Sequence, residues 1–400
     1  MTATQHSGCP VVHLDTGAER PAGEWITEYG RLREQAPVVW NEVGNFWILT
    51  DSDMIREAFQ TPDVFTSDSV RPHDPDPPYH LIPSHEKGQR HVQFRQILNY
   101  AFGPAAVRRT ADRAREHCIA TIEAVAAQGR CDFVADVALI FPTRVFLELV
   151  DLPWTDAPMF VEWIDAIFEG FIAGRDVEAA QEAMAGVRAY YVDKIAERRA
   201  AGVGSVGDFL DHLLQSEVDG TRLSDDDVLN IYTQLSMAGL DTVKSTLAAA
   251  FLHLATHPED QRRIVEDPTV IPTAVEETMR AFPLIMIGRK LGRDVDFHGV
   301  EMHQGEMVML ALPAAMRDPN FFDRPDEVVL DRDPNNHYSF GAGQHRCLGS
   351  HLARMELVTF LEEWHRRIPE YRLAVPVEEV RERGGQLSLR SLPLEWDVPA

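Results

Sequence analysis

The feature that most constrains the fold of this chain is a long apolar segment, Ser224–His257. Ser224 and Asp227 have the spacing of a capping box, in which each side chain bonds the other residue's backbone N–H, and Pro258 ends the segment. Its middle, Ile231–Leu254, is apolar on most faces. A helix of that kind has to be enclosed by protein on all sides, so the segment predicts a long helix through the centre of a large helical molecule.

Shorter elements are expected around that helix. Helical periodicity dominates residues 91–257 and is broken at 151–154 and 201–207, and the proline-rich stretch 66–88 is typical of an irregular loop. Short strands are expected at residues 46–50, within 289–311 and within 387–396. The fold class is therefore mainly α with small β-sheets. We expect a single domain over residues 1–400, in which residues 1–20 are flexible.

Charge and hydropathy exclude several classes of partner. The chain has 38 Lys and Arg against 63 Asp and Glu, a formal net charge of -25. An acidic body gains nothing from a phosphate backbone, so we expect no nucleic acid partner. No segment approaches the roughly 18 apolar residues of a membrane span, and the N-terminus lacks a signal pattern. These observations predict a cytoplasmic protein without membrane contact.

One of the four cysteines differs from the others. Cys9, Cys118 and Cys131 lack the short paired spacings of metal or disulfide scaffolds, and the last two lie where a small apolar thiol packs well. Cys347 instead follows a glycine-rich run and precedes an amphipathic helix. The free N–H groups at a helix start stabilise a thiolate. The apolar stripe of that helix consists of Leu352, Met355, Val358, Leu361 and Trp364.

The residues around Cys347 leave three interpretations open. Gly341, Gly343 and Gly349 allow the backbone to turn tightly and to approach a flat cofactor closely. The thiol can also be a buried cysteine at the start of a helix. The third interpretation is a zinc site, although zinc ligands seldom have this spacing. Its ligands would be His337, His345, Cys347 and His351.

Polar residues interrupt the central helix at Ala238-Gly-Leu-Asp-Thr242. Ordinary core packing does not favour a glycine, an acid and a hydroxyl in an apolar run, and a locally widened helix often marks a functional site. Asp241 can relay protons and Thr242 can donate a hydrogen bond. The alternative is a Thr242 bonded to its own helix and an Asp241 in a buried pair. Lys244, in the next turn, is expected to extend outward to solvent.

The segment Phe340–Gly349 resembles the haem-binding signature of the cytochrome P-450 family, with Phe340, Gly343, Cys347 and Gly349 in the signature positions. The resemblance implies the P-450 fold, with haem b between the long central helix and the Cys-bearing helix. It makes Cys347 the metal ligand, because a thiolate donates electron density to haem iron and favours O–O cleavage. Phe340, Gly341 and Gly349 would then contact the cofactor.

Further motifs match the family in the right order. The Glu277 and Arg280 pair alone would be an ordinary i,i+3 surface pair, but with Arg332 it is similar to the family's structural ion network. The stretch that contains Asp241 and Thr242 resembles the oxygen-activation motif, which implies that both are catalytic. Four residues match the family's haem-propionate contacts: His91, Arg95, Arg289 and His345. Each of the four alone would more often be a surface or core residue.

The resemblance is closest to soluble bacterial members such as camphor hydroxylase. It implies a monooxygenase that inserts one oxygen atom of O₂ into a small apolar substrate, terpenoid-like or a compact aromatic. The alternative function is a haem-thiolate sensor or ligand carrier without turnover. By analogy the substrate pocket would comprise Tyr79, Leu240, Val243, Leu284, Ile285 and Leu387.

Electrons would have to come from other proteins, since no flavin or nucleotide-binding domain is evident. The family analogy implies an iron–sulfur ferredoxin and an NAD(P)H-dependent ferredoxin reductase. A basic patch on the cysteine side would steer such a donor. Its candidate residues are Arg108, Arg109, Arg346 and Arg354. The alternative is a solvated scatter of charges.

Overall fold

The predicted central helix is present, but it is interrupted at one residue. The computed structural model describes residues 9–77, 79–171 and 176–398, and in it the segment forms α9 (Asp225–Leu240) and α10 (Thr242–Thr256), with Asp241 between them. The capping box is confirmed: the Asp227 N–H donates to Ser224 Oγ at 3.1 Å, and the Ser224 N–H donates to Asp227 Oδ2 at 2.9 Å. Pro258 begins the next helix, as its ring allows at a first helical position.

Helices make up most of the described chain. In chain order the other helical elements are α1 (Glu24–Gln35), α2 (Ser52–Gln60), α3 (Gly88–Phe102), α4 (Pro104–Ala126), the π-helix η1 (Phe133–Ala138), α5 (Ile140–Leu149), η2 (Trp154–Asp156), α6 (Ala157–Phe171), α7 (Val177–Ala201), α8 (Phe209–Gln215), α11 (Pro258–Glu266), η3 (Pro268–Val270), α12 (Ile271–Ala281), α13 (Leu312–Ala315), α14 (Ser350–Arg367) and η4 (Val377–Glu379). The predicted breaks near 151–154 and 201–207 fall between α5 and η2 and between α7 and α8.

The strands form one large and several small sheets. The six-stranded sheet has the order β1 (Val11–Val12), β3 (Val38–Asn41), β4 (Phe46–Leu49), β12 (Met307–Ala311), β9 (Met286–Leu291) and β5 (Phe65–Thr66). The small sheets contain β2 (Glu19–Pro21), β6 (Arg130–Asp132), β7 (Glu217–Val218), β8 (Thr221–Arg222), β10 (Val295–Phe297), β11 (Val300–Met302), β13 (Arg372–Leu373), β14 (Arg381–Arg383), β15 (Ser388–Leu389) and β16 (Pro393–Glu395). All three predicted strand regions are confirmed.

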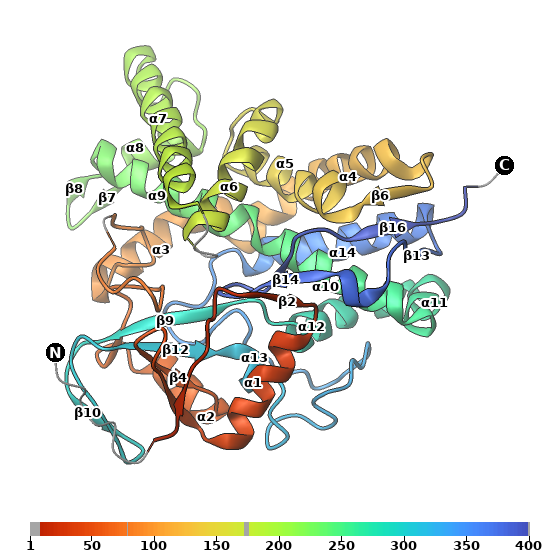
Figure 1. The fold of residues 1–400 in the computed structure, drawn as a ribbon. Coiled ribbons are helices and arrows are strands. Elements are labelled where there is room, and N and C mark those ends of the chain that lie inside the picture. Colours follow the sequence, from red (N-terminus) through yellow and green to blue (C-terminus); the bar gives the residue numbers. More distant parts are fainter. Residues whose placement is uncertain (1–8, 78, 172–175, 399–400) are drawn as a thin grey trace.

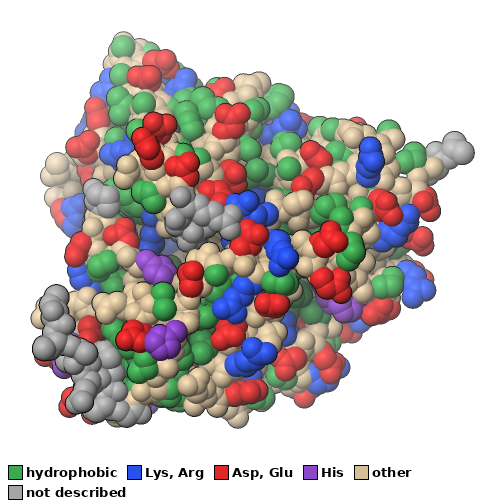
Figure 2. Space-filling view, in the orientation of Figure 1, with side chains coloured by type: hydrophobic (Ala, Val, Ile, Leu, Met, Phe, Trp, Pro, Cys, Tyr) green, Lys and Arg blue, Asp and Glu red, His purple; other side chains and the backbone are tan. Residues whose placement is uncertain are grey.

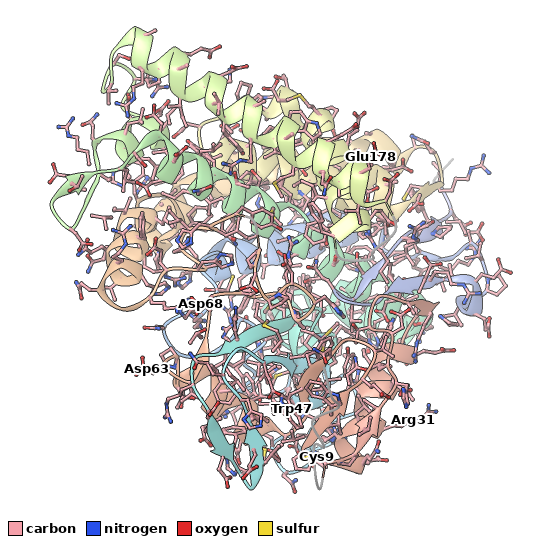
Figure 3. The ribbon with its side chains drawn as sticks, turned by 60° about the vertical axis from the view of Figure 1, so that its left-hand side comes forward. Cys9, Arg31, Trp47, Asp63, Asp68 and Glu178 are labelled. Carbon is pink, nitrogen blue, oxygen red and sulfur yellow. The ribbon has the colours of Figure 1, made fainter. Side chains whose placement is uncertain are left out.

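Both faces of the large sheet are buried. Alternate residues of a strand point to opposite faces. Accordingly Trp47 and Leu49 of β4 pack into one apolar cluster, whereas Phe46 and Ile48 pack into another on the opposite face. In Figure 1 this sheet lies with α1 and α2 in the lower part of the molecule, while α4 to α9 lie in the upper part and α10 and α14 between them. Trp47 is in the lower part of Figure 3 and Glu178, on α7, in the upper part.

The N-terminal lead is only partly within the described residues. Residues 1–8 of the stretch expected to be flexible lie outside them. From Val11 onward the lead takes part in sheets, since β1 pairs parallel to β3 and β2 pairs antiparallel to β14. In the described part of the chain, no helix combines the length and the apolarity that crossing a membrane requires.

Candidate active site

A cavity of about 610 Å³ separates the junction of α9 and α10 from the loop that carries Cys347. Thr242 and Val243 line one wall, and Phe340, His345 and Cys347 line another. The volume lies within the usual range for ligand sites, about 300–1,000 Å³. The central helix and the cysteine loop, which are far apart in the sequence, therefore face a common space.

The cysteine loop has the tight backbone that its glycines predict. Gly341 and Gly343 have φ of +74° and +70°, in the left-handed region where a side chain is strained. A Cβ at Gly343 would lie 2.6 Å from the carbonyl oxygen of Phe59, so this glycine lets the loop pass close to α2. The Cys347 N–H donates to Phe340 O at 2.8 Å, and α14 begins three residues later at Ser350.

The Cys347 side chain lines the cavity, and Cys347 is exposed. Burial in the protein raises its pKa, while the Gly349 N–H and the charges of Arg95, Arg346 and Arg354 act in the opposite direction. The four cysteines are all free. Burial also raises the pKa values of Cys118 and Cys131, which keeps both as protonated, apolar thiols. Only Cys347 combines cavity access with several nearby cations.

Four groups able to carry positive charge converge beside the cysteine loop. The rings of His91 and His345 lie 4.2 Å apart, and Arg95 Nη1 donates to Arg346 O at 2.8 Å. Burial, followed by the charges of His91, Arg289 and Arg95, lowers the pKa of His345 to about 3. Burial lowers that of Arg289 to about 10. Burial also lowers the pKa of His91, so the positive charge of this desolvated cluster comes from Arg95 and Arg289.

This cluster fits the carboxylates of a haem. His91 Nδ1 is buried and has no hydrogen-bond partner in the described structure. The Arg289 guanidinium donates to the backbone oxygen of Gly288 at 2.7 Å, and no ion pair joins it to a carboxylate of the described residues. A buried cation is costly unless it is paired. Two propionates would supply the missing anions, so these residues fit that cofactor.

A buried ion network lies beside the segment that leads into the cysteine loop. Glu277 accepts from Arg280 Nε at 2.8 Å and from Arg332 Nε at 2.9 Å, as the motif order predicted, and both Glu277 and Arg280 are fully buried. Arg280 also donates to the backbone oxygens of Met316, Pro325 and Glu327. The network thus joins α12 to the irregular segment that precedes the cysteine loop.

A neighbouring carboxylate was not anticipated from the sequence. Glu276 accepts from Arg354 Nε at 2.6 Å and from His337 Nε2 at 2.9 Å. Burial alone would raise the pKa of Glu276, but these hydrogen bonds lower it to about 2. His337 therefore pairs with a carboxylate on α12. Among the described residues, no group of three or more His, Cys, Asp or Glu side chains is placed to hold a metal ion by itself.

Asp241 forms a buried polar network at the helix break. Asp241 Oδ1 pairs with Lys244 Nζ, and Oδ2 accepts from Ser245 Oγ at 3.1 Å and from Gln386 Nε2 at 2.6 Å. The expectation that Lys244 extends to solvent is wrong, because its side chain is only 2% exposed and is held by Asp241. Thr242 Oγ1 donates to Ala238 O at 3.0 Å. Gln386, which lines the cavity, connects it to Asp241.

The expected substrate residues divide into two groups. Val243, Leu284 and Ile285 line the cavity. Leu240 packs fully buried in the main core, and Leu387 packs in the cluster against the sheet, so neither lines the cavity. Tyr79 is half-buried beside Arg71, whose guanidinium lies 5.7 Å from the Tyr79 ring. Arg71 and Gln234, which do line the cavity, were not anticipated, because a polar residue in a loop or on a helix carries no signal of its own.

Only some arginines of the candidate basic patch are free of ion pairs with described residues. Arg354 is engaged with Glu276, so it is not free to bind a partner protein. Arg108 and Arg109 are exposed on α4, and Arg346 is exposed in the cysteine loop. No ion pair joins these three arginines to other described residues within 4.0 Å. On the face that Figure 2 shows, acidic and basic side chains are interspersed.

Comparison with known proteins identifies the class. The sequence model of the family described as Cytochrome P450 matches residues 34–383. The chain belongs to this family, and its cofactor is a haem. Its relatives are named as monooxygenases, and this chain is a monooxygenase.

Individual relatives are similar over nearly their whole length. The chain is 32% identical to the steroid C26-monooxygenase of Mycolicibacterium smegmatis over 376 residues, which are 93% of this chain and 92% of that protein. It is 32% identical to the mycinamicin IV hydroxylase/epoxidase of Micromonospora griseorubida, over 92% of this chain and 94% of that protein. The crystal structure of CYP101J2 matches with a TM-score of 0.86 and 31% identity, covering 97% of both chains.

Proposed function

We propose that this monooxygenase acts on a small, largely apolar molecule, terpenoid-like or a compact aromatic, with haem b as its cofactor. The composition of the cavity wall carries the proposal. Its apolar side chains include Leu81, Phe168, Met237, Val243, Phe282, Leu284, Ile285, Met286, Ile287 and Leu312. Because the same space of about 610 Å³ has to hold the haem, the remaining share favours a small substrate.

The chain's residues would hold the cofactor from two sides. Cys347 would supply the thiolate ligand of the iron, with Phe340, Gly341 and Gly349 against the macrocycle. The propionates would be neutralised by His91, Arg95, Arg289 and His345. When bound, the haem supplies the activation of O₂, from which one atom enters the substrate and the other leaves as water.

Asp241 and Thr242 are proposed to handle the protons of this reaction. The Thr242 hydroxyl lies at the cavity wall and donates to Ala238 O, and rotation about its C–O bond would let it donate a hydrogen bond into the cavity instead. Gln386 Nε2 lies 2.6 Å from Asp241 Oδ2 and also lines the cavity. Asp241 is therefore the proposed proton donor of this pair, and Gln386 and Ser245 would hold its carboxylate beside the cavity wall.

A substrate screen tests the proposal. Small terpenoids, compact aromatics and large polar molecules would be compared by the spectral shift that follows displacement of the iron-bound water. Hits would then be turned over in ¹⁸O₂. We expect the small apolar compounds to give both the shift and one labelled oxygen in the product. Binding only of large polar molecules would contradict the proposed substrate class.

We further propose that the electrons come from a ferredoxin and its NAD(P)H-dependent reductase. Support comes from the exposed Arg108 and Arg109 on α4 and Arg346 in the cysteine loop. Exposed charges steer a diffusing partner and make the encounter sensitive to salt. An acidic ferredoxin would complement this part of an otherwise acidic molecule.

Charge reversal at one arginine tests the docking face. We expect Arg109→Glu to slow reduction by a ferredoxin severalfold at low salt and to weaken the dependence of the rate on ionic strength. Stopped-flow reduction measures both. Arg293→Glu, an exposed arginine in the turn after β9, serves as the control for net charge. Equal rates for the two variants at every salt concentration would refute the assignment.

A further inference from the structure

One cation in the cavity wall has no role in the functions described so far. Arg71 lies in the loop after β5 and lines the cavity together with Val70 and Pro72. Its guanidinium is 5.7 Å from the centre of the Tyr79 ring and 5.5 Å from that of Phe171, at the end of α6. Two aromatic rings thus border the charged end of this side chain.

The Arg71 guanidinium has no acidic partner among the residues that the structure describes. The hydrogen bonds of Arg71 with described residues involve its backbone: Arg71 O accepts from the Asp74 N–H at 3.1 Å and from Ser69 Oγ at 3.3 Å, and the Arg71 N–H donates to Ser69 Oγ at 3.3 Å. Asp74 is on the same turn, yet the two side chains form no ion pair. The chain has 63 acidic residues against 38 Lys and Arg, yet no described carboxylate forms an ion pair with this guanidinium.

The loop holds Arg71 in a fixed place. Gly288 of β9 donates its N–H to Val70 O at 2.8 Å. A Cβ at Gly288 would lie 2.8 Å from backbone atoms of both Arg71 and Pro72, so the two segments are in close contact. Ser69 Oγ bonds the Arg71 and Asp74 oxygens and closes the turn. The charge is therefore presented to the cavity by a backbone that needs no rearrangement.

Arg71 is separate from the cationic cluster that fits the haem propionates. The positive groups that act on His345, after burial, are His91, Arg289 and Arg95, and they lower its pKa. Arg71 acts instead on Tyr79 and His85: burial raises the pKa of Tyr79 and Arg71 opposes this, while burial, His80 and Arg71 together lower the pKa of His85. The Arg71 guanidinium borders Tyr79 and Phe171, whereas the Arg289 guanidinium lies 5.4 Å from the centre of the Phe59 ring, so the two cations line the cavity beside different aromatic groups.

We propose that Arg71 anchors a carboxylate on the substrate, so that the enzyme acts on apolar monocarboxylic acids. The guanidinium offers two parallel N–H groups that match a carboxylate, and such charge-assisted pairs are among the strongest hydrogen bonds. The apolar wall would receive the rest of the molecule, with the carbon to be oxidised toward Thr242. This assignment rests on the proposed apolar substrate class and narrows it.

Binding of matched acid and amide pairs tests the anchor. The probes are 4-isopropylbenzoate and dodecanoate, each compared with its primary amide at pH 7.5 on the haem-loaded enzyme by isothermal titration calorimetry. We expect at least one acid to bind about tenfold more tightly than its amide. Arg71→Gln should abolish that preference. Arg71→Lys should keep part of it, because an ammonium keeps the charge but lacks the two parallel N–H groups of the guanidinium. Arg293→Gln is the matched control.

The outcomes separate the anchor from the wider function. Equal affinity of acids and amides for the parent enzyme, or an unchanged preference in Arg71→Gln, would overturn the anchor alone. Loss of haem from Arg71→Gln, read from its absorbance, would assign Arg71 to the propionates and also overturn it. If neither acids nor amides bound, the proposed substrate class would fail together with the anchor. Calorimetry needs no turnover, so failure of catalysis cannot mimic any of these results.

Discussion

Cys347 shows what a single residue type in its sequence context can predict. Its glycines and the following helix predict a thiolate site, and the structure places Cys347 at the cavity with its N–H bonded to Phe340 O at 2.8 Å. Of the three arginine charges near it, Arg346 is its neighbour in the chain, whereas Arg95 comes from α3 and Arg354 from α14. Local sequence carries the loop geometry, whereas the convergence of distant cations depends on tertiary packing.

Replacing the proposed ligand gives the first prediction. In Cys347→Ser a hydroxyl replaces the thiolate, and a serine oxygen does not donate electron density to the iron as sulfur does. We expect the long-wavelength Soret band of the reduced, carbon monoxide-bound protein to disappear, and oxygenase activity with it. The absorption spectrum measures this, with Cys118→Ser as the control because Cys118 is buried away from the cavity. Retention of the band in Cys347→Ser would exclude this ligand.

Among the elements, the central helix shows where prediction from sequence ends. The capping box and Pro258 predicted both of its ends, and the polar run at 238–242 predicted a local widening, which the structure shows as a break at Asp241. It is stabilised by Gln386, which comes from a turn 145 residues further along the chain. Gly239 is explained by close packing, since a Cβ at this position would lie 2.9 Å from the Phe146 side chain of α5. Neither contact has a signature in the local pattern.

The buried Asp241–Lys244 pair makes a prediction about this helix. Lys244→Met would leave the Asp241 carboxylate without its cation in a place that is almost closed to solvent. Removal of one partner of a buried pair costs about 3 kcal/mol or more, so we expect the free energy of unfolding in urea to fall by about that amount. The experiment compares proteins with equal haem content.

A double-mutant cycle separates the pair from general packing effects. In Asp241→Asn/Lys244→Met no uncompensated charge is left, so much of the lost stability should return. If the two single effects simply added, Asp241 and Lys244 would not be coupled, and their buried pair would not stabilise the central helix.

At the scale of the whole molecule, contacts between chain ends complete the fold. β2, near the N-terminus, pairs with β14, near the C-terminus, and Glu382 of β14 accepts from the Gly23 N–H at 3.3 Å. The sequence predicted strands in the C-terminal region, but two-residue and three-residue strands carry too little periodicity to reveal which partner they pair with. The joining of the ends was therefore beyond prediction from the sequence.

The contact between β14 and the N-terminal part of the chain should depend on pH. Burial raises the pKa of Glu382 from 4.5 to about 7, and the Gly23 N–H only partly opposes the shift. Between these two values the Glu382 carboxyl binds more protons in the folded state than in the unfolded state, so its contribution to stability falls as pH rises from 4.5 to 7. The full effect on the free energy of unfolding is about 3 kcal/mol.

Glu382→Gln removes the titrating group, so the variant should gain stability relative to the parent as pH rises and match it near pH 4.5. Urea unfolding at pH 5, 6, 7 and 8 measures the difference, and a gap that stays constant with pH would show that Glu382 titrates normally in the folded protein.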